Sequence, residues 1–272
     1  MAAAPERQPR RQFVLTVEST EQLTPHIVRV VAGGESLAKF GGNGHTDAYV
    51  KLLFVDPALN LEPPYDLAAL RATLPPGQLP VVRTYTVRWV DRTAHRLAID
   101  FVTHGDTGVA APWAMRAVPG DRLVLSGPGG AYAPDPAADW HLLAGDLSAL
   151  PAIAAALEAM PGHARGAAFV EIESPADILD LKCPEQVTLD WLVNPDPADT
   201  GFLARAVDAG HWPVDGVQAF VHGERESVKA VRAVLRTRGV PRESISISGY
   251  WARGRTEDTF QAEKREPIGR ID

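Results

Sequence analysis

The pattern of apolar and polar positions changes once along the chain, near residue 137. Up to that point, short runs rich in β-branched and aromatic residues are separated by clusters of glycine and proline, which is typical of strands joined by turns. We expect strands at residues 12–18, 26–31, 48–55, 79–90, 96–104 and 121–126. Because most of these runs have no long helix between them, they predict a six-stranded antiparallel β-barrel, whose closure removes unpaired strand edges.

The second half alternates strand-like and helix-like runs, beginning at Trp140. Strands are expected at 140–145, 167–173, 187–193, 217–222 and 244–248, and helices at 148–160, 201–209 and 224–238. Such alternation predicts a parallel, Rossmann-like α/β sheet with helices on both faces. We therefore divide the chain into a barrel domain, residues 1–137, and an α/β domain, residues 138–272, which ends in a basic segment.

Ligands of parallel sheets bind at the carboxyl ends of the strands. The residues that the pattern places there are Gly145, Asp146, Glu171, Gly223, Glu224, Gly249 and Tyr250. The first strand runs into AGDLSALPAI, a strand-turn-helix unit that stands in place of the G-x-G-x-x-G motif, which the chain lacks. Ser148 is expected to cap this helix, and Pro151 to lie in its first turn. The helix N-terminus is a candidate for dinucleotide phosphates, although similar units occur in α/β domains that bind nothing there.

Composition limits the location and the cofactors. Residues 1–12 are polar and basic, and the most apolar run, 147–160, is too short to span a bilayer. We therefore expect a cytoplasmic protein without membrane insertion. Cys183 is the only cysteine, which excludes an internal disulfide and a four-thiolate cluster within one chain. We expect it to be a small buried or half-buried side chain, and the scattered histidines predict no bound metal.

Charge is unevenly distributed along the chain. Residues 1–137 carry 13 basic and 13 acidic side chains, residues 138–224 carry 3 and 14, and residues 225–272 carry 11 and 7. The last segment is therefore net +4 in a chain of net −7. A nucleic-acid footprint would be larger and more uniform, so no nucleic-acid partner is expected. The basic segment is either a solvated helix face with charge pairs or a site for an anionic ligand.

The most informative strand carries the sequence RTYTVR, which begins at Arg83. Alternation places Arg83 and Tyr85 on one face with Val87 and Trp89, so a cation and a phenol lie beside apolar residues. An arginine pairs with phosphate, while Tyr85 and Thr86 add a ring edge and hydroxyl groups, which suits a planar anionic ligand. The alternative is an ordinary strand with an exposed arginine and a half-buried tyrosine.

A second candidate is the loop HGDTGVAAPWA, residues 104–114, which directly follows a strand. Its two glycines allow a tight loop, and Pro112 lies where a first helical turn can begin. The free amides of a helix N-terminus suit a pyrophosphate, and the expected donors are those of Ala110, Ala111 and Trp113.

Four stretches together resemble a known family in spacing and order. They are RTYTVR, DFVTHGDTGVAAPWA, GDLSALPAI and the terminal SGYWARGRTED. The chain resembles the siderophore-interacting proteins, FAD-dependent ferric-siderophore reductases of the wider ferredoxin-reductase-like superfamily. The resemblance extends to VESTEQLTPHIVRVV and DAYVKLLF and thus covers nearly the whole chain. R-x-Y-T is shared by many flavin reductases, whereas HGDxG...W and GYWxxGxxED are more particular to this family.

The resemblance implies a barrel that binds FAD and an α/β domain that brings NADH or NADPH. On the flavin side it implies Arg83, Tyr85, Thr86, Val87, Asp100, Val102, His104, Thr107, Gly108, Ala110, Ala111, Trp113 and Ala114. On the pyridine nucleotide side, and over the flavin, it implies Gly145, Asp146, Ser148, Ala149, Gly223, Glu224, Tyr250 and Trp251. Leu147 and Ser148 replace a Glu-Thr pair that is frequent in the family, and Val109 replaces a proline.

The expected reaction passes electrons from NADH or NADPH through FAD to a ferric siderophore. Hard oxygen ligands hold ferric iron more tightly than ferrous iron, so reduction releases the metal. Ferric chelates of this kind are commonly anionic, and the basic segment offers Lys229, Arg255, Lys264 and Arg265 as docking residues.

Two alternatives stay open: a general flavin oxidoreductase with another acceptor, and a flavin-binding sensor without enzymatic activity. We expect a monomer. The choice of nucleotide depends on a pocket for the 2′-phosphate. Between Glu173 and Arg205 the only cation is Lys182, which favours NADH.

Overall fold

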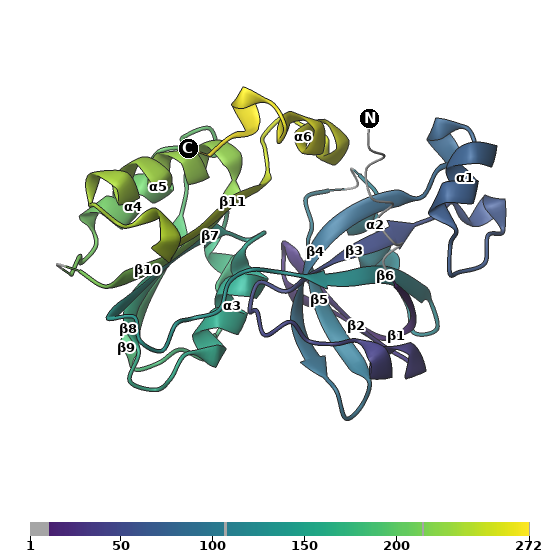
Figure 1. The fold of residues 1–272 in the computed structure, drawn as a ribbon, viewed down its shortest axis with the longest axis horizontal. Helices are drawn as coiled ribbons and strands as arrows, with labels where there is room; N and C mark the ends of the chain where they lie inside the picture. Colours follow the sequence, from purple (N-terminus) through teal and green to yellow (C-terminus); the bar gives the residue numbers. More distant parts are fainter. Residues whose placement is uncertain (1–10, 106–107, 214, 272) are drawn as a thin grey trace, which may run out of the picture.

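The computed structural model describes residues 11–105, 108–213 and 215–271, which form two lobes that lie side by side (Figure 1). The first lobe is a closed barrel with strand order β1-β2-β5-β4-β3-β6, and the second contains a five-stranded sheet with order β11-β10-β7-β8-β9. Neighbouring strands are antiparallel in the barrel and parallel in the sheet. The predicted fold class is therefore confirmed.

All six predicted barrel strands are present. They are β1 (Gln12–Thr24), β2 (Ile27–Gly33), β3 (Tyr49–Phe54), β4 (Val81–Asp91), β5 (Arg96–Val102) and β6 (Arg122–Gly129). The first strand extends beyond residue 18, where the prediction ended, because β1 and β2 form a continuous hairpin in which Thr24 pairs with Ile27.

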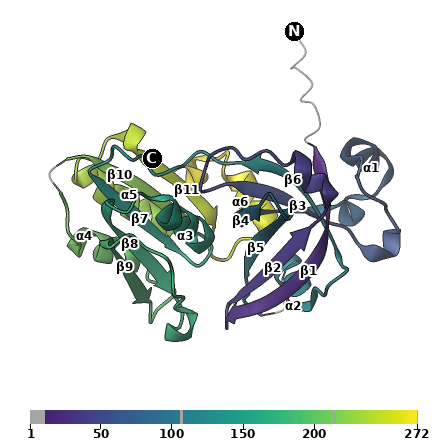
Figure 2. The ribbon, with the colours of Figure 1, turned by 90° about the horizontal axis from the view of Figure 1, so that it is seen from below.

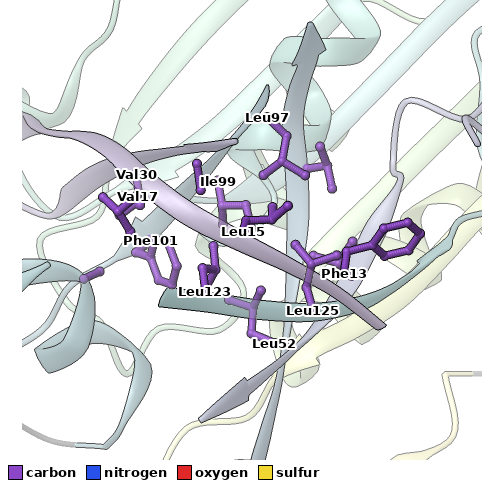
Figure 3. Packing of buried hydrophobic residues seen from close by; sticks show 14 of the residues in the cluster. Phe13, Leu15, Val17, Val30, Leu52, Leu97, Ile99, Phe101, Leu123 and Leu125 are labelled. Atoms are coloured by element: carbon purple, nitrogen blue, oxygen red, sulfur yellow. The ribbon is translucent and has the colours of Figure 1, made fainter. Parts of the chain in front are cut away.

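Alternate residues of the strands fill the barrel interior (Figure 3). On β1 the inward side chains are Phe13, Leu15 and Val17, and on β5 Ile99 and Phe101 face the same core. Each fully buried side chain of this size contributes roughly 1.5–3 kcal/mol relative to an exposed one. This core gives β4 a rigid support.

A β-bulge in β4 changes the alternation of side chains after RTYTV. Val87 pairs with Ile99, but Trp89 pairs with Ala98, so β4 has one residue more than β5 at this point. As a result Val90, rather than Trp89, packs against the barrel core. The expectation that Trp89 shares the face of Arg83 and Val87 is therefore wrong.

The second lobe is a doubly wound sheet. Its strands are β7 (Trp140–Asp146), β8 (Arg165–Ile172), β9 (Gln186–Val193), β10 (Val217–Glu224) and β11 (Ile245–Trp251), and its helices are α3 (Leu150–Ala159), α4 (Phe202–Ala209) and α5 (Arg225–Thr237). The buried residues of α3 belong to a core on one face of the sheet, and those of α4 and α5 to a core on the other face. The strand order reverses between β7 and β10, which is where ligands bind in folds of this type.

Three short α-helices lie outside the predicted pattern or were only partly anticipated. They are α1 (Leu67–Thr73), α2 (Ala110–Arg116) and α6 (Glu257–Glu263), and short 3-10 turns occur at Glu35–Lys39, Pro57–Leu59, Pro76–Gln78, Pro175–Asp177, Arg242–Ser244 and Pro267–Gly269. In both views α6 lies between the two lobes (Figures 1 and 2). It is anchored by Phe260, which is only 1% exposed.

Polar contacts help to join the lobes, among them those of Arg88 and of Asp177. Arg88 of β4 donates two hydrogen bonds to the carboxylate of Glu158 on α3, at 2.5 and 2.9 Å. The fully buried Asp177 accepts a hydrogen bond of 2.9 Å from the hydroxyl of Thr24 and contacts Nδ1 of His26 at 2.8 Å. The lobes are therefore joined by charged and polar bonds as well as by apolar packing.

Three further observations bear on the sequence predictions. The connection between Gly129 and Trp140 contains the proposed boundary after residue 137, and the division into domains stays a prediction. Cys183 is half-buried, as expected, and its Sγ donates to the carbonyl of Val187. Within the described residues, every helix is too short or too polar to cross a membrane.

Candidate functional site

Strand β4 carries Arg83 and Tyr85, which are both half-buried. The Arg83 side chain is 18% exposed and donates to the carbonyl of Val82, while its contact to Asp258 of α6 is long, at 3.3 Å. The Tyr85 ring lies 4.5 Å from the ring of Phe101, and burial raises the pKa of its phenol. A loosely held cation thus lies beside an aromatic wall, which is the chemistry expected for a flavin nucleotide.

The next two residues of β4 face in different directions. Val87 is buried in the barrel core, where it packs with the other inward residues. Thr86 is buried on the opposite face, close enough to Tyr250 of β11 for its hydroxyl to oppose the rise that burial causes in the pKa of the Tyr250 phenol. Thr86 is therefore one of the residues at which the predicted flavin strand meets the second lobe.

The strand and loop after β4 contain five further predicted flavin residues. Asp100 is buried and forms a bidentate ion pair with Arg29, at 2.6 and 2.7 Å, so its carboxylate already has a structural partner. Val102 packs against a cluster of buried residues that spans both lobes. His104 and Gly108 are exposed, and Gly108 has a φ of +83°, which only glycine adopts readily. Thr107 lies outside the described residues.

The predicted helix after this loop is α2, and it begins at Ala110. Ala110, Ala111 and Ala114 are buried. The amide of Trp113 donates to the carbonyl of Val109 at 3.2 Å, so the expectation that it is a free donor for a pyrophosphate is wrong. The Trp113 ring instead packs against Phe54 and Phe101. The other residues of this loop stay predictions for the flavin site.

The turn after β7 is organised by the carboxylate of Asp146. One oxygen accepts from the amide and the hydroxyl of Ser148, at 2.9 and 2.5 Å. The other accepts from the amide of Glu224 at 2.7 Å and from the indole of Trp251 at 2.8 Å. Burial raises the pKa of Asp146, and these hydrogen bonds oppose that rise. Asp146 therefore ties together the carboxyl ends of β7, β10 and β11.

This arrangement corrects the expected helix cap. Ser148 does not cap α3, because its hydroxyl donates to Asp146 and the N-cap residue is Ala149, which makes no side-chain cap. Pro151 lies in the first turn, as expected. The close packing of this turn requires Gly145, since a Cβ there would overlap the carbonyl oxygen of His222 and lie 2.6 Å from the Cβ of Ala149.

The turn after β10 uses Gly223 and Glu224. Gly223 has a φ of +143°, and a Cβ there would lie 2.7 Å from the carboxylate of Asp146. Glu224 is buried and caps α5 through bonds of 2.6 and 3.0 Å from the amides of Glu226 and Ser227. Its second oxygen accepts from the amide of Arg253 at 3.1 Å. Glu224 thus shapes the edge of the sheet, and a direct contact with nucleotide stays a prediction.

Tyr250 and His222 form an aromatic layer beside Thr86. The His222 ring stacks on Phe220 at 4.1 Å and lies 4.9 Å from the Tyr250 ring. Burial, with a smaller effect of the charge on Lys264, lowers the pKa of His222 to about 3, so this ring is neutral near physiological pH. The sequence prediction included Tyr250 but missed His222, which appeared as one scattered histidine among eight.

The four predicted docking cations separate into two groups. Lys229 is paired with Glu226 at 3.1 Å, and Arg255 with Glu263 at 2.6 Å, so both have structural partners. Lys264 and Arg265 are exposed at the end of α6. Lys264 is exposed as a whole, but its Nζ lies 4.7 Å from the centre of the Phe260 ring, and burial of this ammonium group lowers the pKa of Lys264; the charge of Glu257 opposes that shift, and the charge of Lys51 adds a smaller lowering effect. Because Lys264 acts on Lys51 of the barrel and on His222 of the sheet, it lies over the junction between the lobes.

Lys51 is a cation that the sequence prediction missed. It lies on β3 beside β4, donates to the hydroxyl of Thr84 and stands 5.7 Å from the centre of the Tyr49 ring. No motif marks it, because its proximity to Lys264 depends on the way α6 returns to the barrel.

The two sets of predicted residues therefore converge at one place. Strand β4 brings Arg83, Tyr85 and Thr86 to the carboxyl edge of the sheet, where β11 brings Tyr250 and the Asp146 turn holds Trp251. An anionic aromatic ligand on β4 would lie directly beside a ligand bound across the end of the sheet. Such proximity is what the transfer of a hydride between two bound cofactors requires.

Comparison with known proteins identifies the family to which both lobes correspond. The family model described as "Siderophore-interacting FAD-binding domain" matches residues 16–132, and the one described as "Siderophore-interacting protein" matches residues 138–254. An uncharacterized protein of Mycobacterium tuberculosis is 48% identical over 265 residues, which are 92% of this chain and 93% of that protein. The ferric vibriobactin reductase ViuB of Vibrio cholerae is 37% identical over 249 residues, which are 89% of this chain and 90% of that protein.

A solved structure is similar over the same extent. The siderophore-interacting protein SipS from Aeromonas hydrophila superposes with a TM-score of 0.78 at 32% sequence identity and covers 94% of this chain and 98% of its own. The resemblance expected from the four sequence stretches is thus confirmed over both lobes. The chain belongs to the siderophore-interacting protein family.

Proposed function

We propose that this protein is an FAD-dependent reductase that passes electrons from NADH or NADPH to ferric siderophores and so releases ferrous iron. The position of β4 carries the proposal: Thr86 lies close to Tyr250 of β11, and Arg83 and Arg88 contact Asp258 and Glu158 of the second lobe, so the predicted flavin strand lies against the carboxyl edge of the second sheet. The family and the name of the relative from Vibrio cholerae support the same reaction.

The residues on β4 fit a flavin nucleotide. The guanidinium of Arg83 is bonded to a backbone carbonyl and to the exposed end of Asp258, so it can turn to a phosphate without leaving a buried charge unpaired. Tyr85 and Phe101 supply an aromatic wall. When bound, FAD supplies the change from two-electron to one-electron transfer, which reduction of ferric iron requires.

The Asp146 turn fits the pyridine nucleotide. Its hydrogen bonds with Ser148, Glu224 and Trp251 hold the ends of three strands together. These strand ends form the surface on which a dinucleotide can bind. Gly145 and Gly223 allow the strand ends to pack this closely, because a Cβ at either position would clash with neighbouring atoms of His222, Ala149 or Asp146. We assign the donor of electrons, NADH or NADPH, to this edge.

The junction near Lys264 fits an anionic ferric chelate. Lys264 and Arg265 are exposed directly after α6, and Lys51 adds a further positive charge from the barrel. Cations that lie near one another gain from a shared anionic ligand. We therefore propose this surface as the docking site and omit Lys229 and Arg255, whose charges are paired within the protein.

The acceptor is tested by rapid mixing of the anaerobically reduced protein with different oxidants. A ferric catecholate or hydroxycarboxylate chelate should reoxidise the flavin faster than a quinone or free flavin does. Equal or faster reaction with the quinone would instead favour a general flavin oxidoreductase. Failure of both NADH and NADPH to reduce the flavin would favour a sensor without enzymatic activity.

The docking surface is tested by charge reversal. The variant Lys264→Glu/Arg265→Glu should raise the KM for an anionic chelate about tenfold, with less effect at high salt. Arg236→Glu changes an exposed charge at the far end of α5 and serves as the control. An unchanged KM in the double variant would reject this surface. A monomeric state, a cytoplasmic location and the lack of a nucleic-acid partner stay predictions.

A further inference from the structure

Glu171 lies at the carboxyl end of β8, directly beside the Asp146 turn. The two residues are register partners on neighbouring strands. Glu171 is half-buried, and its Oε1 accepts a hydrogen bond of 2.9 Å from the side-chain amide of Asn194. Its Oε2 is shielded from solvent and has no hydrogen-bond partner among the described residues. A carboxylate oxygen in this state is stabilised by any donor that a ligand brings.

The orientation of Glu171 is fixed by Asn194. This residue is 6% exposed, and its backbone amide donates to the carbonyl of Ile172 at 3.0 Å. Its side-chain oxygen accepts from the amide of Asp196 at 3.0 Å, so its side-chain nitrogen must face Glu171. Asn194 is therefore a positioning residue that holds one carboxylate oxygen and leaves the other for a donor.

The surroundings of Glu171 are unfavourable for a further anion. Burial is the main cause that raises its pKa, and the charges of Asp146 and Asp199 add to that effect. Arg205 is ion-paired with Asp199, and Lys182 acts on Glu158, next to α3. Arg253 does lower the pKa of Glu171, but its guanidinium lies over the Trp251 ring, 5.5 Å from the ring centre.

A dinucleotide on this sheet would place its adenosine ribose at Glu171. In doubly wound sheets the pyrophosphate lies at the turn after the first strand, here the Asp146 turn. The ribose then lies at the end of the adjacent second strand, here β8, where a carboxylate accepts its hydroxyl groups. This placement rests on the proposed binding of a pyridine nucleotide.

We infer that Glu171 selects NADH over NADPH: its second carboxylate oxygen accepts a hydrogen bond from the ribose 2′-hydroxyl and repels a 2′-phosphate. Because Oε2 is enclosed, a neighbouring side chain must shift when the ribose arrives. The exposed Arg253, whose charge lowers the pKa of Glu171, can do so.

The test measures binding of nucleotide fragments, which needs no electron transfer. ADP-ribose and 2′-phospho-ADP-ribose are titrated into the purified, flavin-loaded protein by calorimetry. ADP-ribose should bind the wild type about tenfold or more tightly, a difference of about 1.4 kcal/mol or more. Glu171→Gln replaces Oε2 with a donor of the same size, and it should reduce the ratio to about twofold or less.

The control is Glu173→Gln, which removes an exposed charge two residues away. If it also abolishes the preference, a diffuse negative field is responsible and the role of Glu171 is overturned. Equal affinity of the wild type for both fragments, or tighter binding of the phosphorylated one, overturns the inference but not the proposed function. Failure of both fragments to bind overturns the inference together with the proposed nucleotide site.

Discussion

The substitution Asp146→Asn isolates the group that joins three strand ends at the candidate site. In the native turn, each carboxylate oxygen of Asp146 accepts two hydrogen bonds. The asparagine can accept two bonds at its oxygen, but its nitrogen must then face the other two donors. The better orientation keeps the bonds from Glu224 and Trp251, because the hydroxyl of Ser148 can rotate to become an acceptor.

The expected cost follows from that orientation. The amide of Ser148 loses its acceptor at 2.9 Å, and two remaining bonds change from charged to neutral acceptors. Together these losses amount to about 2 kcal/mol, since a bond to a charged group contributes more than a neutral one. In a protein of this size the melting temperature should fall by about 4–8 °C.

The raised pKa of Asp146 also determines how the stability of the wild type changes with pH. Burial raises the folded-state pKa of Asp146 above the ordinary value of 3.8, so the wild type loses stability as the pH rises from that value through the folded pKa. The asparagine variant lacks this dependence. The difference in unfolding free energy between the wild type and the variant is therefore smallest near neutral pH, where it reports the loss of the hydrogen bonds.

Urea denaturation followed by tryptophan fluorescence and circular dichroism measures this difference. Ser148→Ala is the matched control, because it removes one donor and keeps the amide, and it should cost about 0.5–1 kcal/mol. If Asp146→Asn lies within about 0.5 kcal/mol of the wild type, the carboxylate does not organise the turn as described.

Two other predictions concern the joint between the lobes and the glycine of the turn. Arg88→Met leaves Glu158, which is 37% exposed, without its partner, and should lower the free energy of unfolding in urea by about 1–2 kcal/mol. The control Arg122→Met removes an exposed ion pair and should cause no measurable change. Because Arg88 lowers the pKa of Glu158, the greater stability of the wild type is present above pH 4.5 and should decrease as the pH falls through the folded-state pKa. If the stability difference between the wild type and the variant stays the same at low pH, the pairing is refuted. Gly145→Ala places a Cβ against the carbonyl of His222 and should cost about 3 kcal/mol, whereas Gly77→Ala, with open space around it, should be near neutral; equal melting temperatures for the two variants would contradict the packing described.

The fold could be predicted from the sequence because periodicity reports burial directly. Each barrel strand alternates apolar residues toward a single core, and each strand of the sheet is followed by a helix or a long connection. Trp89 shows the limit of this reasoning. Its position depends on a bulge against β5, and the pairing of distant strands leaves no local mark in the sequence.

The site was predictable where residues act locally and not where they depend on distant partners. RTYTVR and the Asp146 turn were found as motifs, and the structure brings them together. The role of Ser148 was mistaken because the nearby carboxylate of Asp146 competes for its hydroxyl. Other features of the site depend on interactions across strands or between lobes, which the sequence alone does not show. They are Lys51, His222 and the unpartnered oxygen of Glu171.

The reduction of bound FAD by a nicotinamide nucleotide tests the central claim most directly. The purified protein, supplied with FAD and freed of excess, is titrated anaerobically with NADH or NADPH, followed by a ferric siderophore. The account predicts a yellow protein whose oxidised-flavin absorption disappears on reduction and returns, with ferrous iron released, when the ferric chelate is added. A protein that binds no FAD, or whose bound flavin neither nucleotide reduces, would contradict it.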